Sequence, residues 1–497
     1  MERGIRSCLV AVRLGEVLGL AEAELGDLYY LSLLAMLGCT ADAHRAAAAF
    51  GDELAFGGQI IPVAMGGPNE VLLWMLRHFA AEEPPVRRAR ALTRAMATAP
   101  RMMAEAGTAH CEVAQLLADR LRFGPGVRDA LGCVLERWNG SGTPLGLKGD
   151  ALPIAVRVLH VAWDAEAFHH LGVQASLDAV RRRAGRAFDP AVVEALRSRA
   201  TDVLEALDPP SAWDAVLAAE PGPPRLLSEV DLDPAATVLA DFADLKSDHT
   251  AGHSRRVGEL AAAAASRLGL DVPGVAEVRR AALVHDLGVV AVSTGIWDKP
   301  GPLGAAEWEQ VRLHAYYTER ILGRTRSFGD VARLASLHHE RLDGSGYHRA
   351  AQASELPVAA RLLAAAEAFQ AMTEPRPHRS ARLPAAAAEE LQREADAGRL
   401  DADAARAVVE AAGQRPRASR RVWPCGLSAR EVEVLGLLAR GWSMREIARR
   451  LVVSPKTIDH HIQHIYDKID VRSRAGARVF AMEHDLIDVI PAQPLPG

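Results

Sequence analysis

The sequence predicts an all-α protein. Alanine and leucine are abundant and aromatic residues make up only 5% of the chain, which favours helices packed through small and aliphatic side chains. Few segments show the alternating pattern of β-branched residues that is typical of strands. Because a chain of 497 residues is too long for one hydrophobic core, we expect about two to four helical domains.

An internal repeat relates two long blocks of the chain. Residues 133–168 and 336–372 share an ER-x-x-GSG core and an LP-x-A-x-R core at a constant offset of 204 positions. A second match joins residues 33–39 to 283–289 at an offset of 250, so the first block carries about 46 additional residues, which we place within 46–100. Two long copies indicate an old duplication rather than a solenoid of many short repeats.

Two stretches predict the boundaries between three blocks. Residues 208–226 are rich in Pro and Gly, and residues 413–424 are basic, so both are expected to be linkers. They separate a first block at 1–207, a second at 227–412 and a third at 425–490.

The bulk composition limits where the protein works. The net charge of −5 argues against contact with nucleic acid along the whole length, but residues 414–481 hold 14 Lys and Arg against 6 Asp and Glu. The five cysteines are odd in number and lack metal-like spacing, which predicts reduced thiols in a cytoplasm. Charges interrupt the N-terminal apolar run, and no uncharged apolar stretch reaches the ~20 residues of a membrane span, so we expect neither a secretory signal nor a membrane anchor.

The second block carries imidazoles and carboxylates inside otherwise apolar runs. The members of this set are His253, His285, Asp286, His314, His338, His339 and Glu367. Buried charge is costly unless it is paired or bound to a metal. A mixed nitrogen and oxygen set suits iron or manganese better than calcium or a thiolate zinc site. We expect Asp286 to bridge two such ions, which would polarise a phosphate and generate hydroxide near neutral pH.

Any one of these histidines taken alone is more often a hydrogen-bonded core residue than a ligand. The first block reverses that preference for the whole set, because it shows the same segment with His110 as the one retained ligand position. The other positions hold Ala35, Met36, Val134, Leu135 and Trp163. We interpret the first block as a second copy of the fold whose site is filled by apolar packing. It would serve as a dimer surface, a sensing pocket or a structural brace.

Residues 249–379 resemble the HD-GYP subfamily of the HD metal-dependent phosphohydrolases. The resemblance is carried by HSRRV, HDLG, KPGPL, the histidine at 314, HHERLDGSGY and ARLLAAAEAFQAM with RPHR. It implies a helical bundle with a binuclear metal site, catalysis by His285 and Asp286, and hydrolysis of cyclic di-GMP or a related cyclic dinucleotide. Arg341 and Asp343 are left for substrate or outer-shell contacts. One ion would be held by His253, His285, Asp286 and Glu367, and the other by Asp286, His314, His338 and His339.

The sequence departs from the pattern of this family at four positions. The lysine usual after HD-x-G is Val289, which removes a phosphate contact, and the proline of GYP is His348. The aspartate of the last ligand helix is Glu367, which reaches one methylene further, and His249 replaces a carboxylate that some members add. The intact ligand set favours an enzyme, whereas Val289 and His348 favour a sensor or dimerisation module without catalysis.

The third block predicts four short helices. Ser428 and Ser443 are each followed three residues later by Glu, which forms a capping box, and Ser454 is an N-cap ahead of a proline. Four isoleucines at helical spacing between 458 and 469 form one apolar stripe, and a last helix is expected near 473–484. The pattern indicates a helix-turn-helix.

Residues 427–487 resemble the LuxR/GerE-type DNA-binding domain. The resemblance implies double-stranded DNA as a partner and binding as a homodimer, whereas a capped basic segment alone would suit a protein-binding module. Lys456, Thr457, Lys468 and Arg474 are the candidates for contacts to the DNA backbone. Asp459, His460 and Gln463 are the candidates for reading base edges.

Together these features predict a cytoplasmic bacterial transcription regulator. In the leading hypothesis, the second block binds or hydrolyses a cyclic dinucleotide and so tunes DNA binding. The alternative is a regulator whose second block only senses the ligand or dimerises. A third hypothesis is a phosphohydrolase of another nucleotide that is delivered to DNA.

Overall fold

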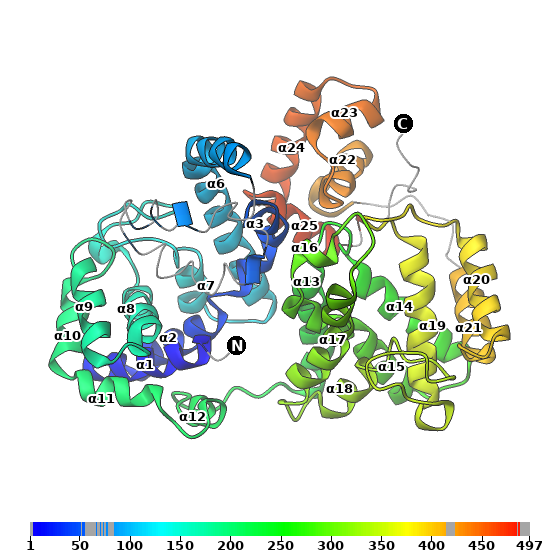
Figure 1. Cartoon of the computed structure of the whole chain (residues 1–497), viewed down its shortest axis with the longest axis horizontal. Coiled ribbons are helices and arrows are strands. Elements are labelled where there is room, and N and C mark those ends of the chain that lie inside the picture. The colour runs from blue at the N-terminus through cyan, green and yellow to red at the C-terminus, as the bar shows by residue number, and fades with distance from the viewer. Residues whose placement is uncertain are drawn as a thin grey trace. The chain divides into compact units, whose positions relative to one another are not determined.

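The computed structural model is helical from end to end (Figure 1). Within the residues that it describes there is no strand, and only isolated β-bridges occur. The predicted all-α fold class is confirmed, with two helical bundles ahead of a four-helix C-terminal domain. The described residues are 3–50, 52–54, 66, 70, 73, 76–77, 84–413, 423–484 and 486–487.

The chain forms two compact units. One comprises residues 1–42 and 48–226, and the other comprises residues 43–47 and 227–497. The helices up to residue 226 are α1 (Arg3–Val17), α2 (Glu22–Leu34), η1 (Leu37–Asp42), α3 (Ala43–Phe50), α6 (Pro85–Arg120), α7 (Pro125–Leu131), η2 (Gly149–Ala151), α8 (Ile154–His169), α9 (Val173–Arg183), α10 (Pro190–Ser198), α11 (Ala200–Leu204), η3 (Glu205–Leu207) and α12 (Ala212–Ala218).

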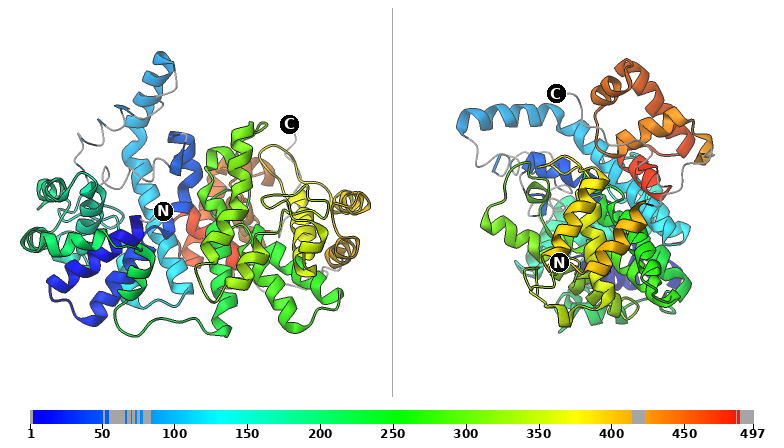
Figure 2. Two further views of the ribbon diagram at one scale, coloured as in Figure 1. Left: turned by 60° about the horizontal axis from the view of Figure 1, so that its bottom comes forward. Right: turned by 90° about the vertical axis from the view of Figure 1, so that its right-hand side faces the viewer.

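Helix α6 is 36 residues long, and Figure 2 shows its first half extending beyond the other helices of the first unit. Most of that half falls within 46–100, the segment predicted to hold the residues added to the first block. Much of the rest of that segment lies outside the described residues. The second half of α6 packs against α7 and η1 and carries His110. Although α6 is long, none of the described helices combines the length and the apolar composition that crossing a bilayer requires.

The segment 208–226, predicted to be a linker, contains helix α12. Val216 of this helix is buried in a small apolar cluster with Cys8 of α1. Ala212 and Val216 lie four positions apart and so share one helix face, which packs on α1. The Pro and Gly residues therefore mark the two ends of a short packed helix as well as a connection.

Alanine builds much of the core of the second unit. Helix α14 packs against α15, α19 and α21, and the buried faces of these helices carry side chains such as Ala261, Ala282 and Ala365. Such small side chains allow helices to approach closely. The helices of this unit are α13 (Glu229–Asp244), α14 (His253–Arg267), α15 (Val272–Val284), η4 (Leu287–Ala291), α16 (Thr294–Trp297), α17 (Ala305–Leu322), α18 (Gly329–Ala335), η5 (Ala353–Glu355), α19 (Val358–Thr373), α20 (Pro384–Asp396) and α21 (Ala402–Gly413).

Corresponding glycines make the same close contact in the two units. A Cβ atom on Gly288 would lie 2.0 Å from the carbonyl oxygen of His314, and one on Gly38 would lie 2.0 Å from that of His110. Each glycine therefore lets the 3₁₀ turn press directly against the backbone of a long helix. The contact brings the residues just before the glycine beside the histidine of that helix.

A corresponding glutamate also plays the same part in both units. Glu340 is fully buried and accepts hydrogen bonds from the backbone amides nine and eleven positions later, at 2.7 and 2.9 Å. Glu136, its counterpart at the offset of 204, accepts from the amides nine and ten positions later. The ER-x-x-GSG repeat thus encodes a loop that folds back on its own buried carboxylate.

The C-terminal domain follows the helix pattern predicted for it. Ser428 and Ser443 form the two capping boxes, and Ser454 caps the third helix. The isoleucine stripe between 458 and 469 is buried in the centre of the domain. Its elements are η6 (Pro424–Gly426), α22 (Ala429–Ala439), α23 (Met444–Leu451), α24 (Pro455–Ile469) and α25 (Arg474–Glu483).

Candidate metal centre and DNA-binding helix

The first three candidate ligands lie at the ends of two helices. His253 is the first residue of α14 and follows Gly252, whose φ of +72° turns the chain into the helix. His285 and Asp286 come directly after the last residue of α15. Because a helix end fixes the direction of the chain on either side of it, these three side chains take defined positions in the core, where all are buried.

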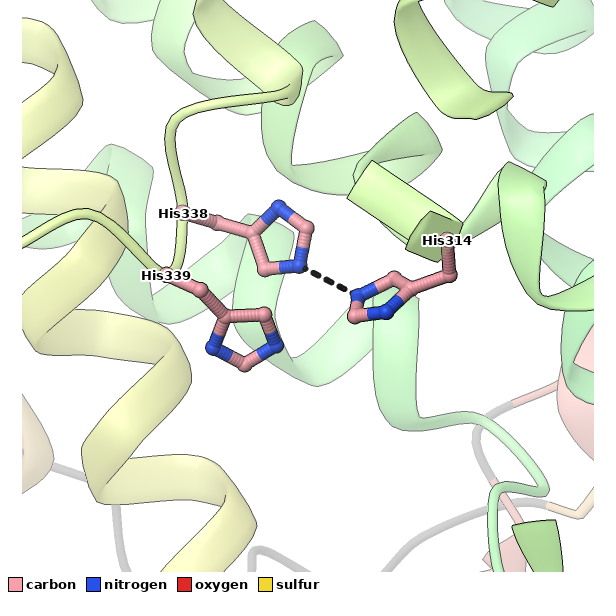
Figure 3. Close-up of side chains that lie close together, drawn as sticks. All are labelled: His314, His338 and His339. Carbon is pink, nitrogen blue, oxygen red and sulfur yellow. Dashed lines mark hydrogen bonds between the residues drawn. The ribbon is translucent and has the colours of Figure 1, made fainter. Parts of the chain in front are cut away.

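The remaining ligands come from three further elements. His314 lies in the middle of α17, and Glu367 lies in the middle of α19. His338 and His339 follow α18 in a turn, as Figure 3 shows, with both rings directed toward His314. The structure therefore brings together all seven residues predicted as metal ligands, from positions up to 114 residues apart.

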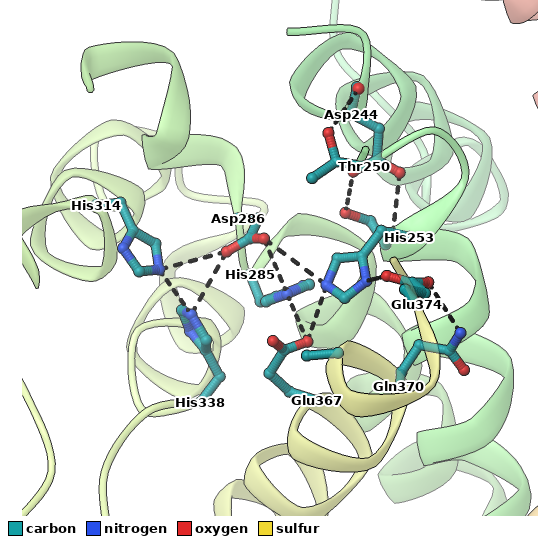
Figure 4. A network of polar contacts seen from close by, with 12 residues as sticks. Asp244, Thr250, His253, His285, Asp286, His314, His338, Glu367, Gln370 and Glu374 are labelled. Atoms are coloured by element: carbon teal, nitrogen blue, oxygen red, sulfur yellow. Dashed lines mark hydrogen bonds and ion pairs between the residues drawn. The ribbon is translucent and has the colours of Figure 1, made fainter. Parts of the chain in front are cut away.

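Asp286 lies at the centre of the set, with two histidines on each of its oxygens (Figure 4). Its Oδ2 is 3.4 Å from Nε2 of His285 and 3.8 Å from Nε2 of His253. Its Oδ1 is 3.4 Å from Nε2 of His314 and 3.5 Å from Nε2 of His338. One carboxylate thus faces two separate groups of nitrogen ligands.

Each group is completed by one further ligand. Oε2 of Glu367 lies 2.9 Å from Nε2 of His253 and 3.4 Å from Nε2 of His285. On the other side, ligand atoms of His339, His314 and His338 lie within 4.8 Å of one another. These two groups follow the division that the sequence resemblance implies, while His285, Asp286 and His338 form a third candidate group across it, so the number of ions stays a prediction.

Hydrogen bonds at the far side of the rings fix which nitrogen faces the centre. Nδ1 of His285 and Nδ1 of His338 each lie 2.7 Å from the carbonyl oxygen three residues earlier, and His314 makes the same kind of bond. Because a carbonyl can only accept, Nδ1 is the donor and Nε2 is left with a lone pair. Nε2 of His314 and Nε2 of His338 then face each other at 3.0 Å. Two lone pairs at this distance repel each other unless a cation lies between them.

Several buried polar atoms of this cluster also lack an aligned hydrogen bond within the described part of the chain. They are Nε2 of His253, Nε2 of His285, Oδ1 of Asp286 and Oε2 of Glu367. Buried polar atoms are nearly always satisfied in folded proteins. A divalent ion on each side of Asp286 would satisfy these atoms, so the residues present fit a metal centre.

The carboxylates of the cluster stay charged. Burial by itself would raise the pKa of Asp286, but His285 and the two histidines on Oδ1 outweigh it and hold that pKa well below its ordinary value. The pKa of Glu367 is likewise held well below its ordinary value, because His253 and His285 outweigh the effect of burial. Both groups are therefore available as anionic ligands.

Helix α24 presents most of its predicted DNA-reading residues to solvent. Asp459, His460 and Gln463 are exposed on the face opposite the isoleucine stripe, and Lys456 is exposed in the first turn. The hydroxyl of Thr457 is 2.8 Å from that of the capping Ser454, so this side chain also helps to start the helix.

Two residues predicted to contact the DNA backbone are engaged inside the domain. Nζ of Lys468 is 2.7 Å from a carboxylate oxygen of Glu431, the residue that completes the first capping box. The guanidinium of Arg474 donates to the carbonyl oxygens of Leu438 and Trp442 at 2.9 Å. Both side chains hold helices together, and their contact with DNA stays a prediction.

Comparison with known proteins shows to which family the chain belongs. Residues 101–192 and 237–404, together more than half of its length, match the HD domain. The chain belongs to the HD domain family. Residues 426–481 match the bacterial regulatory proteins of the luxR family, so the HD domain is joined to a LuxR-type helix-turn-helix domain. HD-domain phosphohydrolases are metal-dependent, in agreement with the ligand groups of the second unit.

Several HD relatives are phosphodiesterases of cyclic dinucleotides. The 3′3′-cGAMP-specific phosphodiesterase 3 of Vibrio cholerae serotype O1 is 32% identical over 386 residues, which cover 76% of this chain and 84% of the relative. A cyclic di-GMP phosphodiesterase of Thermotoga maritima is 34% identical over 145 residues, 29% of this chain and 39% of the relative. The crystal structure of a cyclic GMP-AMP-specific phosphodiesterase of V. cholerae, V-cGAP3, superimposes with a TM-score of 0.55 at 28% identity, covering 84% of this chain and 93% of that one.

Glu374 is part of the candidate metal centre, although the sequence pattern does not single it out. One carboxylate oxygen lies 2.8 Å from Nδ1 of His253, and the other accepts from Arg256 and from Gln370. Burial would raise the pKa of Glu374, but Arg256 and His253 hold it well below its ordinary value. A carboxylate on the outer nitrogen fixes the ring of a metal-binding histidine and makes it more basic. The sequence does offer one signal for Glu374: it is a charged residue directly before a proline and directly after α19, the helix that carries Glu367.

Replacing Glu374 with Gln is expected to weaken metal binding about 10–100-fold, because a neutral amide orients the His253 ring less firmly. Competition against a chelator of known affinity for manganese measures this change, and excess metal should restore most of the lost activity. Glu390→Gln, which removes the charge of a glutamate paired with Arg393 near the surface, is the matched control. Equal metal affinities in the two variants would contradict a positioning role for Glu374.

Two aromatic rings pack against histidines of the candidate metal centre. Tyr347 stacks on His339 with ring centroids 4.5 Å apart, and Trp297 meets the edge of His314 at 5.4 Å. Arg341 is half-buried and donates to the backbone of its own loop, whereas Asp343 is exposed and accepts from Ser345. Arg341 therefore remains a candidate for substrate contact, and the observed role of Asp343 is to hold the turn.

The first unit lacks the ligand set at the corresponding positions. Ala35, Val134 and Trp163 are buried in its apolar core, and Met36 and Leu135 pack against that core. His110 alone keeps an imidazole there. That this unit lacks a binuclear site stays a prediction.

Proposed function

We propose that the second HD unit is a metal-dependent phosphodiesterase of cyclic dinucleotides, with 3′3′-cGAMP as the first substrate to test and cyclic di-GMP as the second. The observation that carries this proposal is the position of Asp286 between two groups of histidines. A relative whose match covers 76% of this chain is a 3′3′-cGAMP-specific phosphodiesterase, which supports the choice of substrate. When bound, two divalent transition ions such as iron or manganese supply charge that polarises a phosphodiester and lowers the pKa of water.

The residues of the chain contribute binding and orientation. Asp286 holds the two ligand groups at a fixed separation, and His285 orients it from one side. Arg341 is the half-buried cation next to His339 and would bind a phosphate oxygen, in the manner that guanidinium groups favour. The stacked ring of Tyr347 would place a base or ribose beside the centre.

The direct experiment is turnover by the purified full chain after anaerobic loading with Fe(II) or Mn(II). Chromatography of the linear product separates hydrolysis of 3′3′-cGAMP from that of cyclic di-GMP. Product formation that requires metal supports the enzyme. Binding of either dinucleotide without product would instead favour a sensor, and one observation speaks for that second function: Val289 is a buried aliphatic residue at a position where the resembling family has lysine.

We further propose that the LuxR-type domain binds double-stranded DNA as a homodimer, with α24 in the major groove. Lys456 and Thr457 would contact phosphates at the start of α24, where backbone amides also favour anions. Asp459, His460 and Gln463 would meet base edges on the exposed face of the helix.

Replacing Lys456 with Ala is expected to weaken binding on every DNA sequence and to lower the salt slope of affinity by about 1, because one phosphate contact is lost. Replacing Gln463 with Ala should instead change sequence preference, at a cost of about 1–3 kcal/mol on the preferred site. Fluorescence anisotropy over a series of salt concentrations measures both effects.

Lys468→Ala tests the two roles available to that residue. Because its ion pair with Glu431 lies within the domain, we expect lower thermal stability and an unchanged salt slope. A slope that falls as it does for Lys456→Ala would assign Lys468 to the DNA backbone.

A further inference from the structure

We propose that Met36, Cys39 and His110 of the first unit form a mononuclear site for a soft monovalent cation, Cu(I). The three side chains stand where the second unit has Asp286, Val289 and His314, at the same two offsets that relate the duplicated segments. The first unit would thus keep a metal site at the place of the lost binuclear centre, with different chemistry.

The three ligand atoms lie close together. Sγ of Cys39 is 3.6 Å from Sδ of Met36 and 3.8 Å from Nδ1 of His110. Metal–sulfur bonds of about 2.3 Å would place neighbouring ligands of a three-coordinate ion about 4 Å apart. The observed separations are close to this value, so an ion could enter with small movements of the side chains.

The ring of His110 already has the tautomer that a metal needs. Its Nε2 lies 2.8 Å from the carbonyl oxygen of Ala35, which can only accept, so Nε2 carries the proton. Nδ1 therefore directs its lone pair toward the thiol of Cys39. His314 of the second unit uses the opposite nitrogen for its backbone bond, so the imidazole has been turned over between the two copies.

The donor set selects the kind of ion. A thiolate, a thioether and an imidazole suit Cu(I), whereas iron and manganese prefer the nitrogen and carboxylate set of the second unit. The two carboxylate positions are lost here, because Met36 replaces the bridging aspartate and Trp163 replaces the glutamate. Cys39 is exposed and Met36 is half-buried, so an ion can reach the site from solvent; binding would release the thiol proton.

The test is an anaerobic titration of the full chain with Cu(I) in competition with a chromogenic Cu(I) chelator. The second unit is first saturated with Mn(II), so that its histidines are occupied. We expect one Cu(I) per chain, with sulfur neighbours in its X-ray absorption spectrum. Cys39→Ser and Met36→Leu should each lower the affinity, and loss of the thiol should cost more than the roughly 10–100-fold that loss of an outer-shell partner costs. Cys425→Ser, which removes the other exposed cysteine, should leave it unchanged.

Three results would overturn the proposal: no copper held against the chelator, copper without sulfur neighbours, or equal retention by Cys39→Ser and the unaltered chain. Thermal unfolding of each variant shows whether the first unit remains folded. Because the readout is copper binding, it is independent of whether the second unit hydrolyses a cyclic dinucleotide.

Discussion

Replacing Asp286 with Asn is expected to abolish hydrolysis of cyclic dinucleotides, with a loss of about a thousandfold or more, equivalent to about 4 kcal/mol. Both oxygens of this carboxylate face histidine pairs, so the neutral amide removes an anionic ligand from both groups at once. The NH₂ group would also point a donor at imidazoles or ions that need an acceptor. Product formation at saturating metal and the metal content of the dialysed protein measure the two effects.

Asp330→Asn is the matched control for this experiment. Asp330 is an exposed carboxylate on α18, the helix that leads into the paired histidines, and it contacts none of the candidate ligands. Activity of the Asp286 variant equal to that of the Asp330 variant would remove the metal centre from the proposed reaction. Retained metal with lost activity would instead narrow the role of Asp286 to catalysis.

Replacing Gly288 with Ala is expected to destabilise the second unit by about 3 kcal/mol or more. The new Cβ would lie 2.0 Å from the carbonyl oxygen of His314 and 2.6 Å from the backbone nitrogen of Thr318. Neither atom belongs to a flexible side chain, so α17 would have to move away from η4. That movement would also break the bonds of the Thr318 hydroxyl to the amide of Gly288 and the carbonyl of His285, both 2.8 Å long.

Urea denaturation followed by far-ultraviolet circular dichroism measures this loss, and metal content reports the disturbance of the site. Gly329→Ala is the matched control, because a Cβ at this first position of α18 meets nothing within 4 Å. An unchanged unfolding midpoint for Gly288→Ala would show that the two elements can separate at little cost. A midpoint that falls equally in both variants would point to the loss of glycine itself rather than to the contact.

The sequence was sufficient to predict the helical class, the repeated segments and the seven candidate ligands that the structure brings together. The decisive information was the pair of copies, since the segment with histidines at 338 and 339 could be read beside one with Val134 and Leu135. The helix starts of the C-terminal domain could equally be predicted from the sequence, because a serine cap and the glutamate three residues later lie within one turn. In both cases the signal is local or repeated.

The remaining features depend on partners far away in the sequence. Glu374 acquires its role from His253, 121 positions earlier, and Lys468 is turned inward by Glu431, 37 positions earlier. A single sequence gives the charges of such residues but not the pairings. The same limit applies to α12, whose Val216 becomes a core residue only through contact with α1.

The buried glutamate of the repeated loop changes how such proteins should be recognised in genomes. Glu136 and Glu340 grip their loops in the same way, although only one copy stands beside a cluster of imidazoles. The signature ER-x-x-GSG therefore indicates the folded loop and does not by itself indicate a metal centre. A search that scores this signature alone would find it twice in this chain, whereas the two residues immediately upstream distinguish the copy with paired histidines from the copy with Val134 and Leu135.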